Sequence, residues 1–155
     1  MFVIFLQVAG NGFVCGAYTS VSWPADAATT DQPRFLPDPS DRTFLFSLVN
    51  AHGRPAKLRL EGGESGRAIH VKGSGYGPGF GGGADVRLMW GQQSANHAIG
   101  CFVHPRSFEI DQDAEAAADL PPIRFAYDKT LLTGDDGTGG VGVSFAAEEI
   151  EVYQL

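Results

Sequence analysis

Hydrophobic residues along the chain form short runs that are separated by glycine- and proline-rich segments. The runs at Phe2–Val8 and at residues 43–49 are apolar on both faces, which is typical of central strands covered on both sides. Residues 57–60 alternate polar and apolar side chains, which predicts a half-exposed strand, and Val86, Leu88 and Trp90 share one face at a period of two, which also predicts a strand. Further strands are predicted at residues 13–19, residues 68–71 and Ile99–Val103.

The segments between these runs carry strong turn signals. Asn11 and Gly12 stand between the first two runs, and they predict a hairpin because both residue types accept positive φ. Residues 24–41 contain four of the nine prolines and predict a surface loop. Residues 111–119 are the one helix-prone segment, which is read as one or two helical turns or as an acidic surface insertion. Turns are expected at 61–66 and 133–140, and short extended pieces at 123–127 and 130–132.

The final fifteen residues predict a last strand with an interruption. Val143 and Phe145 share one parity along this strand, whereas Ile150 and Val152 share the other. A regular strand cannot change its buried face without a shift of one residue. The pattern therefore predicts a β-bulge or bend near residues 147–149.

Composition agrees with a single globular domain over residues 1–155. Hydrophobic residues make up 43% of the chain, which is enough to build a core, and 21 glycines and nine prolines favour short strands joined by many turns. Helical periodicity is almost absent. The predicted fold class is therefore mainly β, a sandwich of two antiparallel sheets with one or two short helices.

Charge narrows the choice of partners. The formal net charge of −7 disfavours a nucleic-acid partner and an anionic membrane surface, since both require a basic face. The apolar run at residues 2–6 has no preceding Lys or Arg and is too short for a signal peptide or a membrane span. We therefore expect a cytoplasmic protein without membrane insertion.

The glycine-dense stretch at residues 73–83 invites comparison with nucleotide-binding loops. Gly77, Gly79 and Gly82 satisfy the spacing G-x-G-x-x-G, but a strand rather than a helix is predicted to follow them. The stretch also lacks the Lys that ends a P-loop. We therefore interpret it as a structural crossover loop and predict no nucleotide cofactor.

The thiols and imidazoles of the chain do not form a recognisable reactive site. Cys15 and Cys101 each stand in an apolar run beside a glycine, which predicts two buried, inert thiols, and they could form a redox pair only on neighbouring strands. No two histidines have the short spacing of a zinc site, so no metal is predicted. The histidines are His52, His70, His97 and His104.

Two alternative functions remain open at this point. A hydrolase would use Ser94 and His97 with Asp85 nearby, although no serine lies in a G-x-S-x-G nucleophile elbow. A carbohydrate-binding sandwich would need exposed aromatic rings, for which the candidates are Tyr76, Trp23 and Trp90. Trp90 shares a strand face with Val86 and Leu88, and this pattern favours core packing over sugar stacking.

Five segments in a fixed order resemble the TLDc domain, the TBC- and LysM-associated domain of the oxidation-resistance proteins. They are residues 16–23 (GAYTSVSW), 44–48 (FLFSL), 77–86 (GPGFGGGADV), 131–134 (LLTG) and 148–153 (EEIEVY). The resemblance spans nearly the whole chain, and together the segments are specific. The sequence departs from the family where Cys15-Gly16-Ala17 replaces a commoner paired glycine, and in lacking the family's N-terminal part, so we expect a truncated domain.

The resemblance implies a fold and a function. It implies a β-sandwich of two antiparallel sheets that acts as a non-catalytic protein-interaction domain, linked to resistance to oxidative stress and to binding of the peripheral sector of the vacuolar proton pump (V-ATPase). It carries over no catalytic, cofactor or metal residues. By position, the loops at residues 24–41, 92–96 and 111–119 are the expected binding surfaces.

The residues that match the family motifs are expected to be structural. Phe80 has the most defined expected role, an anchor in the core around which the glycines turn. The full set is Gly16, Trp23, Phe44, Phe46, Gly77, Pro78, Phe80, Gly81, Gly82, Gly83, Asp85, Gly134, Glu149, Ile150 and Glu151.

Overall fold

The computed structural model describes residues 1–26, 32–51, 53, 55–60, 64–71, 76–82, 86–90, 99–103, 108–110 and 143–155. These residues form short strands and one 3₁₀ helix, η1 (Glu64–Arg67). The strands are β1 (Phe2–Val8), β2 (Val14–Thr19), β3 (Arg34–Leu36), β4 (Phe44–Val49), β5 (Ala56–Leu60), β6 (Ile69–Val71), β7 (Tyr76–Phe80), β8 (Val86–Trp90), β9 (Ile99–Val103), β10 (Phe108–Ile110) and β11 (Val143–Gln154).

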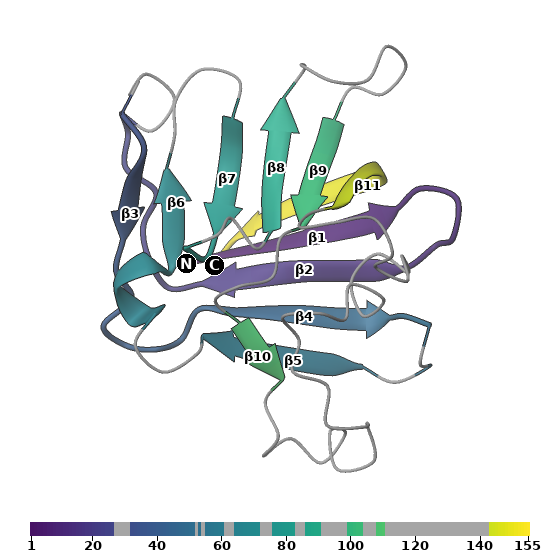
Figure 1. Cartoon of the computed structure of the whole chain (residues 1–155), viewed down its shortest axis with the longest axis horizontal. Coiled ribbons are helices and arrows are strands. Elements are labelled where there is room, and N and C mark those ends of the chain that lie inside the picture. The colour runs from purple at the N-terminus through teal and green to yellow at the C-terminus, as the bar shows by residue number, and fades with distance from the viewer. Residues whose placement is uncertain are drawn as a thin grey trace.

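The strands build two antiparallel sheets that share β11. The first sheet has the order β10-β5-β4-β2-β1-β11, and the second continues as β11-β9-β8-β7-β6-β3. Figure 1 shows the strands of the first sheet running across the direction of β6 to β9, with both chain ends side by side. The predicted fold class, a mainly-β fold of two antiparallel sheets, is confirmed.

The strand β11 passes from one sheet to the other through a bulge. Its residues 143–146 pair with β9, and its residues 147–154 pair with β1. Gln7 lies opposite Glu149 while Val8 lies opposite Ala147, so Glu148 is the extra residue. The bulge predicted near residues 147–149 is therefore confirmed.

A single hydrophobic cluster joins the two sheets. Phe80 is the largest of its fully buried side chains, with 1% of its surface exposed, as expected for a core anchor. Burial of each large apolar side chain contributes roughly 1.5–3 kcal/mol. Other members of the cluster from the first sheet are Ile4, Leu6, Leu45 and Leu58, and from the second sheet Ile69, Val71, Val86 and Leu88.

The hairpin between β1 and β2 forms as predicted but with a longer turn. Gly10 and Gly12 have φ of 88° and 69°, whereas Asn11 is not among the residues with positive φ. The Asn11 side chain instead accepts a hydrogen bond from the Phe13 amide at 3.0 Å. The Asn-Gly pair therefore acts through side-chain capping of a wider loop and not as a two-residue turn.

Two expectations about loops are wrong. The predicted loop at residues 24–41 contains the short strand β3, which pairs with β6 and is bounded by Pro33 and Pro37. The glycine-dense crossover loop contains β7, with a register shift between Tyr76 and Gly79. The expected turn at 61–66 contains the start of η1, and β10 was not predicted at all.

The β7 strand exists because its glycines permit close packing. A Cβ atom on Gly79 would lie 3.2 Å from the His70 Cβ on the paired strand β6, so this position suits glycine. At the end of β7, Gly81 has a φ of 81° and its amide donates to the Ala68 carbonyl at 3.0 Å. The local sequence looks like a loop, but these pairing contacts favour a strand.

Several predicted segments lie outside the described residues. They are the segments 111–119, 123–127, 130–132 and 133–140 and the polar loop at 92–96.

We expect Gly16→Ala to destabilise the first sheet. A Cβ atom at this position would overlap the Ile4 carbonyl oxygen and lie 2.5 Å from the Phe46 ring. Overpacking of this kind costs about 1–3 kcal/mol, which chemical denaturation would measure. The control is Gly66→Ala in η1, where nothing lies within 4 Å, and its effect should stay within about 0.5 kcal/mol. Equal stability of the two variants would contradict the packing described for Gly16.

Candidate functional site

The connection from β3 to β4 holds a buried carboxylate, Asp38, of which only 1% is exposed. Its Oδ2 atom accepts hydrogen bonds from the Thr43 amide and hydroxyl, both at 2.7 Å, and from the Arg42 amide at 3.0 Å. Its Oδ1 atom accepts from the Ser40 amide at 3.1 Å and from the Ser20 hydroxyl at 3.3 Å. Both oxygens therefore have several donors.

These donors determine the charge state of Asp38. Burial alone would raise the pKa of the carboxyl group, but the hydrogen bonds from Ser40 and Thr43 outweigh it and lower the pKa to about 2. A carboxylate whose oxygens are filled by fixed donors is a poor proton acceptor for a substrate. We therefore interpret Asp38 as a structural residue.

The Asp38 network connects three parts of the chain. Ser20 follows β2, Thr43 precedes β4, and the Asp38 amide donates to the Ser65 carbonyl in η1 at 2.8 Å. The Thr43 hydroxyl also lies 2.9 Å from the Thr19 hydroxyl at the end of β2. The sequence analysis missed this network, although an Asp followed by Ser and Thr in a proline-rich turn is a signal of side-chain capping.

We expect Asp38→Asn to lower the free energy of unfolding at pH 7 by about 2 kcal/mol, because the native pKa of about 2 lies below the reference value of 3.8. The stabilisation from a lowered pKa is complete above pH 3.8 and is lost as the pH falls through about 2. The difference between wild type and variant should therefore shrink to about half by about pH 3. Urea unfolding across this pH range measures it.

The matched control for this prediction is Asp41→Asn in the same connection. Asp41 is exposed and has a φ of 53°, a backbone conformation that Asn also tolerates. This control removes the same charge without removing an acceptor from the network. A pH-independent difference between wild type and Asp38→Asn would argue against the role assigned to the carboxylate.

The outer face of the first sheet carries a group of aromatic side chains that we call the outer aromatic face. The strand registers place Phe5 beside Phe46 across Gly16, and Tyr18 beside Phe44. The Phe5 and Phe46 ring centroids are 5.2 Å apart, and the stacked Tyr18 and Phe44 rings are 5.0 Å apart. The outer aromatic face comprises Val3, Phe5, Tyr18, Phe44, Phe46 and Tyr153.

This arrangement depends on the glycine in its centre. The Phe46 ring occupies the space that a side chain at Gly16 would fill, and the ring is buried to 8% exposure although it lies on the outer side of the sheet. The alternate positions of β1 and β4 were predicted to be covered, and here the Phe5 and Phe44 rings both pack against Phe46. Tyr153 is 48% exposed at one side of the group, so part of the face is open to solvent.

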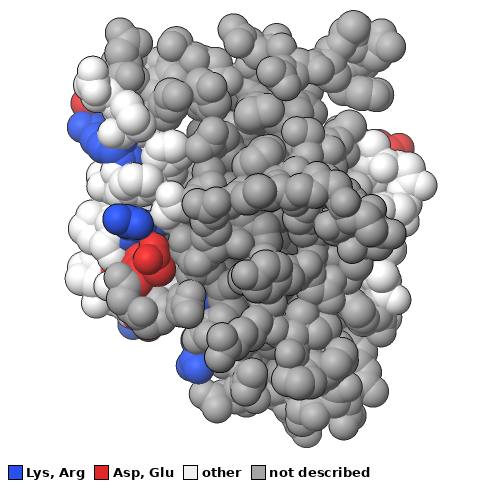
Figure 2. All heavy atoms as spheres, viewed as in Figure 1, with Lys and Arg blue, Asp and Glu red and all other residues white. Residues whose placement is uncertain are grey.

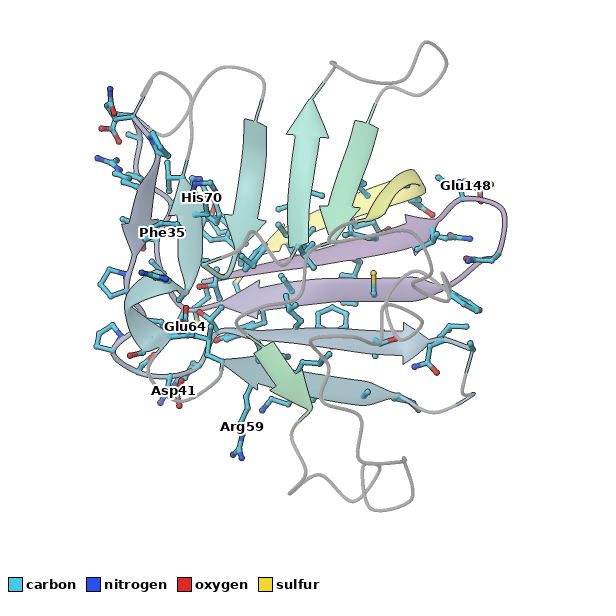
Figure 3. The ribbon with its side chains drawn as sticks, viewed as in Figure 1. Phe35, Asp41, Arg59, Glu64, His70 and Glu148 are labelled. Carbon is cyan, nitrogen blue, oxygen red and sulfur yellow. The ribbon has the colours of Figure 1, made fainter. Side chains whose placement is uncertain are left out.

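Charges of opposite sign flank the outer aromatic face. Lys57 and Arg59 on β5 lie at one side, and the Lys57 ammonium is 4.6 Å from the Phe44 ring centroid. Figure 3 shows Arg59 extending away from the sheet. On the opposite side, Glu149 and Glu151 lie on β11 with the same parity as Tyr153. The Tyr153 hydroxyl donates to Glu151 at 3.0 Å, and this hydrogen bond raises the pKa of the phenol.

The second sheet ends in a smaller aromatic group. Phe35 on β3 stacks on His70 of β6 with a centroid distance of 4.9 Å, and Figure 3 shows the two side chains together. The Arg67 guanidinium lies 5.8 Å from the Phe35 ring centroid. Figure 2 shows basic and acidic side chains next to one another at this side of the molecule, and Arg34 pairs with Asp26 there. Positive and negative side chains are therefore mixed in this region.

The family-motif residues fall into two groups in the structure. Gly16, Phe44, Phe46, Glu149 and Glu151 come together on the outer aromatic face and its acidic side.

The remaining motif residues that the structure describes belong to the core or its turns. The partly buried Trp23 packs edge to face on the buried Phe80 with ring centroids 6.1 Å apart, and Ile150 packs half-buried against the core. Gly77, Pro78 and Gly81 lie in or just after β7, followed by Gly82. The motif residues outside the described part are Gly83, Asp85 and Gly134.

The other candidate sites from the sequence are the aromatic rings for sugar binding, the two cysteines and the pair of Ser94 and His97. Trp23 is partly buried and packs against the hydrophobic core, which does not favour a role in an exposed row of sugar-binding rings. Cys15 is buried, and its strand β2 is separated from β9, which carries Cys101, by β1 and β11. Ser94 and His97 lie outside the described residues.

Among the residues that the structure describes, no three His, Cys, Asp or Glu side chains gather as metal ligands would. In the same part of the chain, no helix has the length and apolar character needed to cross a membrane.

Comparisons of the chain with protein-family models, with curated proteins and with solved structures find no match. The resemblance to the TLDc domain therefore rests on the sequence segments alone and stays a prediction.

Proposed function

We propose that this chain is a non-catalytic protein-interaction domain that binds its partner through the outer aromatic face. The observation that supports the proposal is the combination of partly exposed aromatic side chains with a basic side, Lys57 and Arg59, and an acidic side, Glu149 and Glu151. Aromatic groups surrounded by charged residues are typical of protein-binding surfaces. The loops expected from sequence to bind partners are not needed for this proposal.

The sequence resemblance adds a candidate partner. TLDc-type domains are associated with resistance to oxidative stress and with the peripheral sector of the V-ATPase, and we propose this sector as the partner in the cytoplasm. The acidic and basic sides of the face are suited to orient a protein partner, since complementary charges at the rim of an interface steer association. The proposal needs no cofactor or metal.

The test of this proposal is capture of partners from cell lysate by the tagged domain, followed by detection of V-ATPase subunits. We expect the double variant Lys57→Glu/Arg59→Glu to reduce recovery of the partner by about tenfold, because it reverses the basic side of the face. Both side chains are exposed, and chemical denaturation of the double variant checks that the domain stays folded.

The matched control reverses two exposed charges elsewhere, Arg42→Glu and Arg67→Glu. It has the same net charge as the face variant, so the comparison separates a specific surface from general electrostatics. Equal recovery with both variants would contradict a role for the outer aromatic face. A cooperatively folded wild-type domain that recovers no pump subunit would rule out the proposed partner.

A further inference from the structure

Among the described strands, the C-terminal half of β11 forms an edge of the first sheet. Residues 147–154 pair with β1 on one side, whereas β9 pairs only with residues 143–146. Among the described elements, β1 and β9 are the ones that lie along β11. An edge strand presents backbone donors and acceptors that another chain can use.

The hydrogen-bond phase shows which backbone groups face this edge. The Leu155 amide donates to the Met1 carbonyl at 3.1 Å, so Leu155 and Met1 form a hydrogen-bonded pair. Antiparallel pairs alternate between bonded and non-bonded, which places the groups of Tyr153 and Glu151 toward β1 as well. The amide and carbonyl groups of Ile150, Val152 and Gln154 therefore point away from β1.

The side chains at this edge are exposed on both faces of the strand. Val152 has the parity of the core-facing Ile150, yet 57% of it is exposed, and Tyr153 on the other face is nearly as exposed. Leu155 is 66% exposed just beyond the strand. Exposure of both parities means that neither face of this strand end is covered.

The charges along the edge are all acidic. Glu148 in the bulge and Glu149 and Glu151 beyond it are exposed, and none forms an ion pair with a described residue. Figure 3 shows Glu148 at the end of the first sheet, near the turn that follows β1. A second copy paired antiparallel at this edge would bring glutamates against glutamates, which disfavours self-association.

We propose that the edge of β11 at residues 149–154 binds an extended segment of a partner protein as an added strand, and that this segment alternates Lys or Arg with Val, Ile or Leu. The inference rests on the proposed function as an interaction domain and names the chemistry of one bound segment. Backbone groups of Ile150, Val152 and Gln154 would supply the pairing. The basic side chains would lie beside Glu149 and Glu151.

The alternation in the partner follows from the alternation in β11. Successive side chains of a strand point to opposite faces, so an added strand places every second residue beside Ile150 and Val152. The intervening residues lie beside Glu149, Glu151 and Tyr153, where a cation meets two carboxylates and continues the outer aromatic face. A segment of the same composition in which all basic residues precede all apolar residues cannot place basic side chains on one face and apolar side chains on the other.

The first experiment measures binding of a short fluorescent peptide in which Lys and Val alternate to the purified full chain by fluorescence anisotropy. The control peptide has the same composition with all Lys residues before all Val residues. We expect the alternating peptide to bind at least about tenfold more tightly. Equal affinities would overturn the proposal, because they would indicate charge attraction without strand pairing.

The second experiment removes one donor from the edge. Val152→Pro deletes an amide that points away from β1, a position where an edge strand tolerates proline, and we expect a loss of at least about tenfold in affinity. Val152→Ala keeps the amide and should retain affinity within about threefold. Unchanged binding by a folded Val152→Pro variant would overturn the proposal.

The peptide can carry the same test without any change to the protein. Two alternating peptides are N-methylated at every second amide, one at the Lys residues and one at the Val residues. An added strand turns one set of amides toward β11 and the other set away. We therefore expect one methylated peptide to lose binding and the other to keep it, and equal behaviour of the two would overturn the proposal even if Val152→Pro failed to fold.

Two further comparisons test separately the acidic charges of the β11 edge and the proposed function of the domain. Glu149→Gln/Glu151→Gln should weaken binding and flatten its dependence on salt between about 50 mM and about 500 mM, whereas Glu64→Gln in η1 should not. Unchanged binding in the double variant would overturn the proposed basic partner. Lysate capture by the Val152→Pro variant tests the proposed function independently. If this variant still captures the partner but no longer binds the peptide, the proposed function as an interaction domain stands and the proposed binding at the β11 edge is contradicted.

Discussion

The structure depends on one strand serving two sheets. The first four residues of β11 continue the second sheet through β9, and the rest closes onto β1 in the first sheet. A bulge at Glu148 allows this change, because an extra residue shifts the strand parity by one position between the part paired with β9 and the part paired with β1. Among the described strands, the end of β11 has a partner on only one side. The strand that joins the two sheets thus also forms this edge.

The Asp38 network makes a second connection at the other end of the molecule. The chain crosses from β3 in the second sheet to β4 in the first through a turn that has few apolar side chains to hold it. Asp38 holds this turn by hydrogen bonds instead of apolar contacts, because its buried carboxylate accepts hydrogen bonds from the amides and hydroxyls of Ser40 and Thr43. A lowered pKa is the consequence of that arrangement and does not by itself indicate catalysis.

Much of the strand pattern could be predicted from the sequence, because hydrophobic periodicity is a local property. The bounds of β1 and β9 coincide with apolar runs, and those of β8 and the position of the bulge follow from parity. β3 and β7 could not be predicted, because the prolines and glycines in and beside them are typical of loops. Both segments are strands because they pair with β6, which the local sequence does not show. Asp38 was missed because its donors lie on separate segments. The outer aromatic face was missed because a run such as Phe44–Val49, which is apolar on both faces, predicts only that both faces are buried. The pattern does not distinguish burial under another layer from packing against neighbouring rings of the same sheet.

The outer aromatic face and the edge of β11 are best understood as one continuous surface. Tyr153 belongs to both, because its ring lies 5.9 Å from Phe5 on the face while its strand forms the edge. Gly16 leaves room for the Phe46 ring in the centre, Lys57 lies against the Phe44 ring at one side, and the acidic residues of β11 lie at the other side. A strand added to β11 would extend the first sheet and carry its own basic side chains beside the aromatic group. The glutamates that protect the edge against acidic or self-associating strands would then be the groups that select a basic one.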